Sequence, residues 1–255
     1  MSGVLGRILP AEAFGFLLIT VRLAALVMVM PVLGDHSVPR RTRVAFALAL
    51  SLVIYPTIKN ILPPMPASVI ELAALFIREL TIGLMMGLVT RILLTATHTA
   101  GSLIAFTTGL SAAQSFDPSQ GSQSALISTF MTLMAVTMIV VTNMHHLLIM
   151  GMVNSYQKFP VGMSVPYADF ATVTVHYVSW AFMLGVQLAM PFIVYGFVYY
   201  VGLGLISRMI QGFQVFFVGM PVNLFFGFAL MMMLLGTIIN VFLDRFGQHL
   251  VDFVG

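Results

Sequence analysis

The chain has 255 residues, of which 60% are hydrophobic and only 7% are charged, with 11 basic and 8 acidic side chains. A soluble domain is about 25% charged, so these few charges cannot cover a water-facing surface, and an ordinary soluble enzyme is excluded. The net charge of +3 is small, the basic residues are scattered, and there is no cysteine. Nucleic-acid binding, disulfides and thiolate metal sites are therefore excluded as well.

Apolar segments follow one another along the whole chain and predict an all-α membrane protein. A helix needs about 20 apolar residues to cross the hydrocarbon, and about five to seven crossings fit this chain. No linker divides it, so residues 1–255 are interpreted as one unit. The apolar segments are 12–33, 44–62, 69–112, 125–150, 173–207 and 209–243.

The first segment is too long for a cleavable signal peptide, so we expect it to remain as the first helix. The densest basic cluster, Arg40, Arg41 and Arg43, follows it. Loops rich in Lys and Arg stay on the cytoplasmic side of a membrane. This basic loop is therefore predicted to be cytoplasmic, with the N-terminus on the outer side.

Charged residues inside apolar segments are the usual sign of a functional site in a membrane protein. Arg22 lies in the middle of the first segment, and Glu71, Arg78 and Glu79 lie in the third. Residues 71 and 78 are two helical turns apart and share a face. An ion pathway, a structural ion pair and helices that lie outside lipid all fit these charges. Gly83-x-x-x-Gly87 predicts a close approach of the third helix to a neighbour.

A polar segment, residues 109–124, separates two apolar elements and contains residues typical of irregular backbone. An external loop fits this composition. A re-entrant plug also fits, because irregular backbone at membrane depth must line protein or water. The candidate plug residues are Gly109, Phe116, Asp117, Pro118 and Gly121.

Residues 177–207 and 209–243 contain no charged side chain, and a straight helix of either length would exceed the bilayer at about 1.5 Å per residue. Pro191, Gly219 and Pro221 lie within them, so we expect broken helices or helical hairpins here. Such breaks require other protein segments to satisfy the freed backbone groups. They indicate a packed assembly or a lined cavity.

Catalytic motifs such as HExxH, GxSxG and a P-loop are absent from the sequence. His145 and His146 are neighbours, so we expect their rings on different faces of a helix, unable to share a metal. The sequence therefore predicts neither an enzyme nor a bound cofactor.

Four stretches resemble one family, in order along almost the whole chain. They are PVLGDHSVPRRTRVAFALAL (31–50), GLSAAQSFDPSQGSQ (109–123), TNMHHLLIMGMVNSYQKFPVG (142–162) and LAMPFIVYGFVYYVGLGLISRMIQGFQVFFVGMPVNLFFGF (188–228). Together they are similar to the FliR family of flagellar biosynthetic proteins, which is related to the SctT proteins of virulence-associated type III secretion.

The resemblance implies a subunit of the flagellar protein-export gate, with a fold like a fused FliP plus FliQ within a helical assembly. The implied partners are FliP-like ring subunits, FliQ-like hairpins, an FlhB-like subunit, membrane lipid and the unfolded proteins that are exported. The implied location is the bacterial inner membrane, as a multi-pass protein of the flagellar basal body. Segment 109–124 takes the position of the pore plug, and Arg208 is expected to support assembly.

Two alternatives remain open from the sequence. The segment FTTGLSAAQ (106–114) is uncharged, which favours a flagellar member over an SctT-type virulence subunit. A small-molecule or ion transporter is the second alternative, although a transporter more often places charged residues on several facing helices.

Overall fold

The computed structural model describes residues 2–34, 38–110, 126–209 and 215–254. Every secondary-structure element within these residues is a helix. The prediction of an all-α protein is confirmed. In chain order the elements are α1 (Ser2–Val29), α2 (Arg40–Ile58), the 3-10 helix η1 (Lys59–Ile61), α3 (Val69–Thr107), α5 (Leu126–Val141), α6 (His145–Lys158), α7 (Tyr167–Met209) and α8 (Val215–Val254).

Five helices are long and apolar enough to cross a membrane, and the described residues give up to six spans if the bent pair of α5 and α6 counts as one. The shortest two spans are Pro10–Val29 and Arg40–Ile61. The high apolar content of these helices explains why they form without an amphipathic pattern, since lipid or protein surrounds them on every side. The structure therefore supports a multi-pass membrane protein.

The chain folds into two compact units, each made of segments that are distant in sequence. The first contains Met1–Ile92, Thr142–Tyr177 and Gln248–Gly255, and the second contains Leu93–Val141 and Val178–Gly247. The chain passes from one unit to the other within α3, α7 and α8, and at the break that follows α5.

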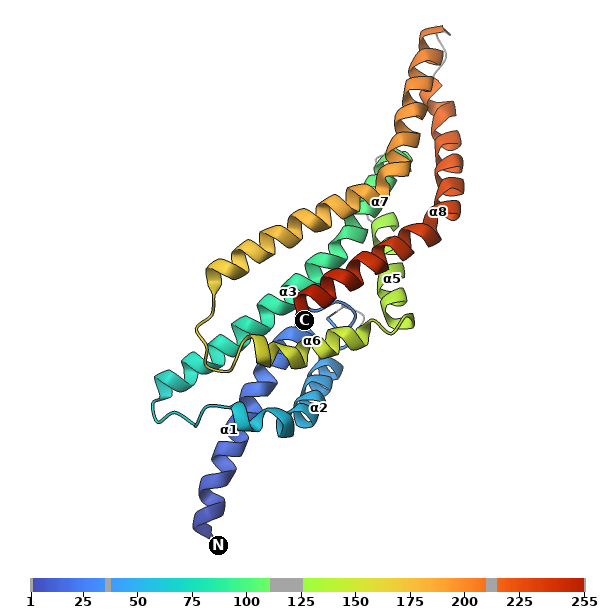
Figure 1. The fold of residues 1–255 in the computed structure, drawn as a ribbon. Helices are drawn as coiled ribbons and strands as arrows, with labels where there is room; N and C mark the ends of the chain where they lie inside the picture. The colour runs from blue at the N-terminus through green and yellow to red at the C-terminus, as the bar shows by residue number, and fades with distance from the viewer. Residues whose placement is uncertain (1, 35–37, 111–125, 210–214, 255) are drawn as a thin grey trace. The chain divides into compact units, whose positions relative to one another are not determined.

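In the first unit α1 and α2 form an antiparallel hairpin (Figure 1). Gly15 in the middle of α1 faces Tyr55 near the end of α2, and the rings of Phe16 and Tyr55 meet edge to face with centroids 6.2 Å apart. Leu18, Ile19 and other residues on the same face of α1 are fully buried. The hairpin places the end of α2 beside the middle of α1.

The predicted segment 125–150 is divided into two helices by a sharp bend. α5 and α6 meet at an angle of 77° across a break at residues 142–144. Asn143 has a φ of 61°, a left-handed conformation that cannot continue a helix and that Asn tolerates better than most residues. The sequence did not predict this break, because residues 125–150 form one continuous apolar segment.

Pro191, Gly219 and Pro221 do not end helices, contrary to the expectation from the sequence. Pro191 lies inside α7, and the other two residues lie inside α8. A proline in a helix removes one hydrogen bond and bends the axis, but neighbouring helices can compensate for the lost bond. Figure 1 shows α7 changing direction partway along its length.

Small residues allow very close helix packing in the second unit. A Cβ placed on Gly101 of α3 would lie only 2.5 Å from the Cα of Ser128 in α5. The hydroxyls of Ser102 and Ser128 are 2.9 Å apart, at hydrogen-bond distance, beside this contact. The backbones of α3 and α5 are therefore in direct contact at this point, with no flexible side chain between them.

We expect Gly101→Ala to destabilise the chain, because the added methyl meets backbone that cannot move aside. Overpacking of this kind costs about 1–3 kcal/mol, which lowers the thermal midpoint by about 2–4 °C per kcal/mol in a chain of this size. The midpoint is measured by heating membranes and quantifying the folded chain extracted afterwards.

Gly236→Ala is the matched control, since a Cβ on Gly236 in the exposed part of α8 meets nothing within 4 Å. Removing a glycine from a helix there should be neutral or stabilise by about 0.5–1 kcal/mol. Equal effects of the two substitutions would contradict direct backbone contact at Gly101.

Candidate functional site

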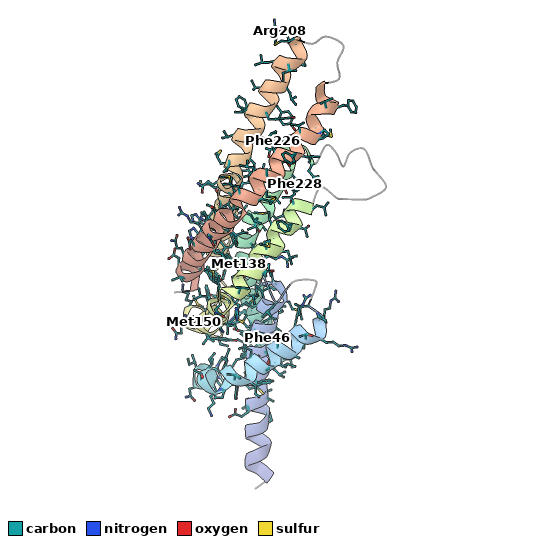
Figure 2. The ribbon with its side chains drawn as sticks, turned by 90° about the vertical axis from the view of Figure 1, so that its right-hand side faces the viewer. Phe46, Met138, Met150, Arg208, Phe226 and Phe228 are labelled. Atoms are coloured by element: carbon teal, nitrogen blue, oxygen red, sulfur yellow. The ribbon has the colours of Figure 1, made fainter. Side chains whose placement is uncertain are left out.

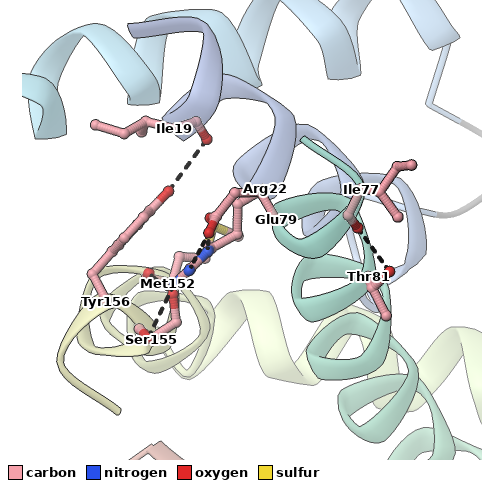
Figure 3. A network of polar contacts seen from close by, with 8 residues as sticks. All are labelled: Ile19, Arg22, Ile77, Glu79, Thr81, Met152, Ser155 and Tyr156. Atoms are coloured by element: carbon pink, nitrogen blue, oxygen red, sulfur yellow. Dashed lines mark hydrogen bonds and ion pairs between the residues drawn. The ribbon is translucent and has the colours of Figure 1, made fainter. Parts of the chain in front are cut away.

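A fully buried ion pair joins α1 to α3 in the first unit. Arg22 Nε donates to Glu79 Oε2 at 2.6 Å, and Arg22 Nη2 donates to Glu79 Oε1 at 3.0 Å. Both side chains have an exposed fraction of 0%. The fork-shaped, two-bond geometry is the strongest that an arginine and a carboxylate can form. Figure 3 shows the pair at the centre of a polar network.

The same arginine binds a third helix, α6. Arg22 Nη1 donates to the carbonyl of Ser155 at 3.1 Å, and its guanidinium carbon lies 4.2 Å from the ring centroid of Tyr156. The Tyr156 hydroxyl donates back to the carbonyl of Ile19 in α1 at 3.2 Å. A cation over an aromatic face is attracted by the ring quadrupole. One charged side chain therefore fixes α1, α3 and α6 together.

Two glycines bring α1 and α3 close enough for this pair to form. A Cβ on Gly83 would collide with the carbonyl of Arg22, and a Cβ on Gly87 would lie 2.9 Å from the Cβ of Val29. The close approach predicted from Gly83-x-x-x-Gly87 is thus confirmed. Glu79 lies one turn before Gly83, so the carboxylate and both glycines share one face of α3.

The other predicted charges occupy different surroundings. Glu71 is exposed in the first turn of α3, where an acid suits the positive end of the helix dipole. Arg78 Nη1 donates to the carbonyl of Gly162 at 3.2 Å, in the connection before α7. Sequence reasoning selected Arg22 and Glu79 separately and did not pair them. Glu79 lies one turn before Gly83, on the face of α3 that was predicted to approach a neighbouring helix, and this position could have indicated that Glu79 is the partner of Arg22.

A second polar network is centred on Asn223 of α8, which is 2% exposed. The Tyr195 hydroxyl donates to Asn223 Oδ1 at 2.8 Å. Asn223 Nδ2 donates to the carbonyl of Thr107, the last residue of α3, and to the Tyr200 hydroxyl, both at 3.3 Å. Tyr199 donates to the carbonyl of Gly219 at 2.5 Å. This network joins α3, α7 and α8 beside Pro221, and sequence reasoning missed it.

Gly109 is the candidate plug residue that the structure describes. It follows the end of α3 with a φ of 78°, a conformation that favours glycine at the end of a helix. A Cβ there would lie 3.1 Å from Asn223 Nδ2, so a larger residue would disturb the network. Phe116, Asp117, Pro118 and Gly121 lie outside the described residues.

Arg208 and the basic cluster lie at helix ends. Arg208 is exposed in the last turn of α7 (Figure 2), where a cation suits the helix dipole.

The basic cluster of Arg40, Arg41 and Arg43 forms the first turn of α2 and not a loop. Arg43 Nε donates to the carbonyl of Val38 at 2.9 Å. Three cations at a helix start are electrostatically unfavourable, so their presence there needs an external reason such as a membrane surface or a partner.

The rings of His145 and His146 lie next to each other, whereas the sequence predicted that they would lie on different faces of a helix. The ring centroids of His145 and His146 are 4.2 Å apart, because both residues follow directly on the bend at Asn143. Within the described residues, no group of three or more His, Cys, Asp or Glu side chains could hold a metal. The two polar networks bind helices to one another, and neither contains a nucleophile beside a base.

Comparison with known proteins relates the whole chain to bacterial export. The family model described as "Bacterial export proteins, family 1" matches residues 13–249. The chain is 39% identical over 233 residues to the flagellar biosynthetic protein FliR of Caulobacter vibrioides, covering 91% of this chain and 93% of that protein. It is 31% identical over 229 residues to FliR of Bacillus subtilis, covering 89% and 88%. It is 26% identical over 211 residues to Yop proteins translocation protein T of Yersinia pestis, covering 82% and 80%.

A double-mutant cycle tests the buried ion pair. Arg22→Met or Glu79→Leu alone removes one partner of the buried pair, which costs about 3–5 kcal/mol. Arg22→Met combined with Glu79→Leu removes both charges, so we expect it to restore much of the stability. The readouts are the thermal midpoint and the amount of chain in the membrane.

Glu71→Gln is the control, because Glu71 is an exposed carboxylate on the same helix, and it should change neither readout. If the double variant is as unstable as the sum of the single variants, Arg22 and Glu79 act independently and the pair is not the link between α1 and α3.

Proposed function

Because this chain belongs to family 1 of the bacterial export proteins, with FliR relatives along almost its full length, we propose that it is a subunit of the flagellar protein-export gate. In this proposal it forms, with FliP-like and FliQ-like subunits, the channel through which unfolded flagellar proteins leave the cell. The observation that carries the function is the 39% identity to a flagellar FliR over 91% of the chain.

A subunit of a virulence secretion system is the second candidate. It is favoured by the similarity to the Yersinia translocation protein T, at 26% identity. The flagellar function is preferred because the identity to two flagellar FliR proteins is higher and extends over more of the chain.

Helix length supports a multi-subunit assembly. α3, α7 and α8 contain 39, 43 and 40 residues, so each is about 60 Å long at 1.5 Å per residue. The hydrocarbon is about 30 Å thick, and a tilt of about 40° is the upper end of the usual range. Such helices extend beyond the hydrocarbon on any ordinary path.

Large apolar side chains are exposed at many positions along these helices. On α7 the exposed fraction is 69% for Val175 and 83% for Met209. On α8, Met232 and Met233 are 83% and 80% exposed, and Figure 2 shows Phe226 and Phe228 among its projecting side chains. Apolar surface of this length cannot be covered by acyl chains alone, so neighbouring subunits are the covering that fits.

The partners assigned in this proposal are FliP-like ring subunits, FliQ-like hairpins and an FlhB-like subunit at the cytoplasmic entrance. The location assigned is the inner membrane, within the flagellar basal body. Arg208, an exposed cation at the end of α7, is assigned to subunit assembly. The apolar exposed surface and the family membership support these assignments.

Residues 109–124 are assigned as the plug that closes the channel, with Phe116 as its apolar contact. The base of this segment supports the assignment, because the end of α3 at Thr107 is held by Asn223 of α8. An anchored base allows a segment to move without moving the helix before it.

Co-expression tests the gate function directly. The chain expressed alone should aggregate after extraction in mild detergent, because its long apolar helices lack their covering. Co-expression with FliP-like and FliQ-like subunits should give one complex of defined size, measured by size-exclusion chromatography. A well-behaved monomer that binds a small ligand would instead support a transporter.

Deleting residues 112–120 tests the plug. The complex should assemble in normal yield, and its ion conductance in a planar bilayer should rise, because the obstruction is shortened while Gly109 and α5 are retained. Replacing the same nine residues with a Gly/Ser segment of equal length separates loss of the plug sequence from loss of length. Unchanged conductance of an assembled complex would show that this segment does not close the channel.

A further inference from the structure

A cavity of about 300 Å³ lies in the first unit, where residues 11–15 of α1 meet the end of α2 and η1. A volume of this size is at the lower end of the range for small-molecule sites. Its lining combines charged, amide and apolar groups: Ala11, Glu12, Phe14, Gly15, Tyr55, Lys59, Asn60, Leu62, Pro63, Pro64 and Met65.

Two opposite charges line this cavity without pairing with each other. Glu12 and Lys59 are exposed, and among the described residues no ion pair involves either side chain. The Tyr55 hydroxyl donates a hydrogen bond to Glu12 Oε2, which orients the carboxylate and leaves Oε1 available. Asn60 adds an amide that can donate or accept. The cavity therefore offers a carboxylate and an ammonium to one ligand.

The walls of the cavity are preformed. A Cβ on Gly15 would lie 2.8 Å from Leu62 Cδ1 and 3.3 Å from Tyr55 Cε2, so the chain after η1 packs directly against α1. Pro63 and Pro64 fix the backbone that forms the opposite wall. A rigid site loses little entropy when it binds a ligand.

The position of the cavity along the helices indicates where its ligand comes from. The span Arg40–Ile61 ends here, so the cavity lies at the level where an apolar span meets lipid headgroups. Arg40, Arg41 and Arg43 begin α2 at its other end, which places the cavity at the outer leaflet. Exposed apolar residues, Leu52 and Val53, lie about two turns deeper on α2 and provide surface for acyl chains.

We propose that this cavity binds the headgroup of one phospholipid that carries both a primary ammonium and a phosphate, as in phosphatidylethanolamine. The ligand's ammonium donates to Glu12 Oε1, and its phosphate accepts from Lys59 and Asn60. A glycerol headgroup has no cation for Glu12. A choline headgroup has no N–H to donate, and its quaternary ammonium is usually bound by aromatic cages, which this carboxylate-lined cavity does not resemble.

Native mass spectrometry of the full chain, co-purified with its partner subunits, tests this site. The probes are palmitoyl-oleoyl phosphatidylethanolamine, phosphatidylglycerol and phosphatidylcholine, which share the same acyl chains. We expect one phosphatidylethanolamine per chain to survive delipidation, and about tenfold less in Glu12→Gln or Lys59→Met, since each substitution removes one charge-assisted contact. Lys59→Arg keeps the cation and should retain the lipid.

Glu71→Gln and Arg91→Met are the matched controls, because they remove an exposed carboxylate and an exposed cation outside the cavity. Neither should change lipid retention. Equal retention of phosphatidylglycerol, or full retention in Glu12→Gln with Lys59→Met, would overturn the proposal. Displacement by an equimolar amount of soluble phosphoethanolamine would also overturn it, because the acyl chains would then add nothing.

The test is independent of the channel function. The lipid is counted on the folded chain, and the thermal midpoint of each variant shows that the exposed substitutions leave the fold intact. Loss of lipid binding with normal assembly, or normal lipid binding in a chain that forms no channel, would separate the two proposals.

Discussion

Arg22 and Glu79 are buried among apolar side chains, and each charge is tolerated there only while the other stays within hydrogen-bond distance. This requirement controls the packing around it. α1 and α3 must approach closely, which Gly83 and Gly87 permit, and α6 must present the Ser155 carbonyl to the remaining guanidinium donors. A buried ion pair adds little net stability compared with a well-packed apolar contact. Its effect here is to select one register of three helices whose other contacts are interchangeable leucine, isoleucine and methionine side chains.

In the second unit the register of the helices is fixed by polar side chains that carry no charge. Asn223 holds the end of α3 and two tyrosines of α7 by hydrogen bonds, while Gly196 and Gly227 face Thr107 and Thr108 at close range. Apolar helices gain no hydrophobic free energy from association when lipid is the alternative environment. Small residues and polar side chains must then supply the specificity, and both units combine the two.

The sequence predicted the features that depend on composition and on short local spacing. Helix content, the multi-pass class and the Gly83–Gly87 contact all follow from such local signals. The partner of Arg22 did not follow, because Glu79 is distant in sequence and the choice among Glu12, Glu71 and Glu79 depends on how α1 lies on α3. The prediction that Pro191 and Pro221 end helices was wrong for a related reason, since it also depended on contacts between distant segments. Pro191 and Pro221 each remove one local hydrogen bond. Tyr195 and Tyr199 of α7 bind the carbonyls of Asn223 and Gly219 on either side of Pro221, and these tertiary contacts, which hold α8 in place, are not visible in the sequence. The break at Asn143 was hidden within an apolar run that reads as one helix.

The lengths of the helices indicate which exposed apolar surfaces can be covered by lipid and which need neighbouring protein subunits. The helix α1 has 28 residues and the span Arg40–Ile61 has 22, so they are about 42 and 33 Å long and fit the hydrocarbon at tilts within the usual range. Acyl chains can cover such a hairpin, which is why a headgroup site on it is consistent with a lipid ligand. α3, α7 and α8 are about 60 Å long, and large apolar side chains are exposed along them. Bilayer thickness therefore separates a short lipid-facing hairpin from long helices that need protein neighbours, and a channel subunit requires both kinds of surface at once.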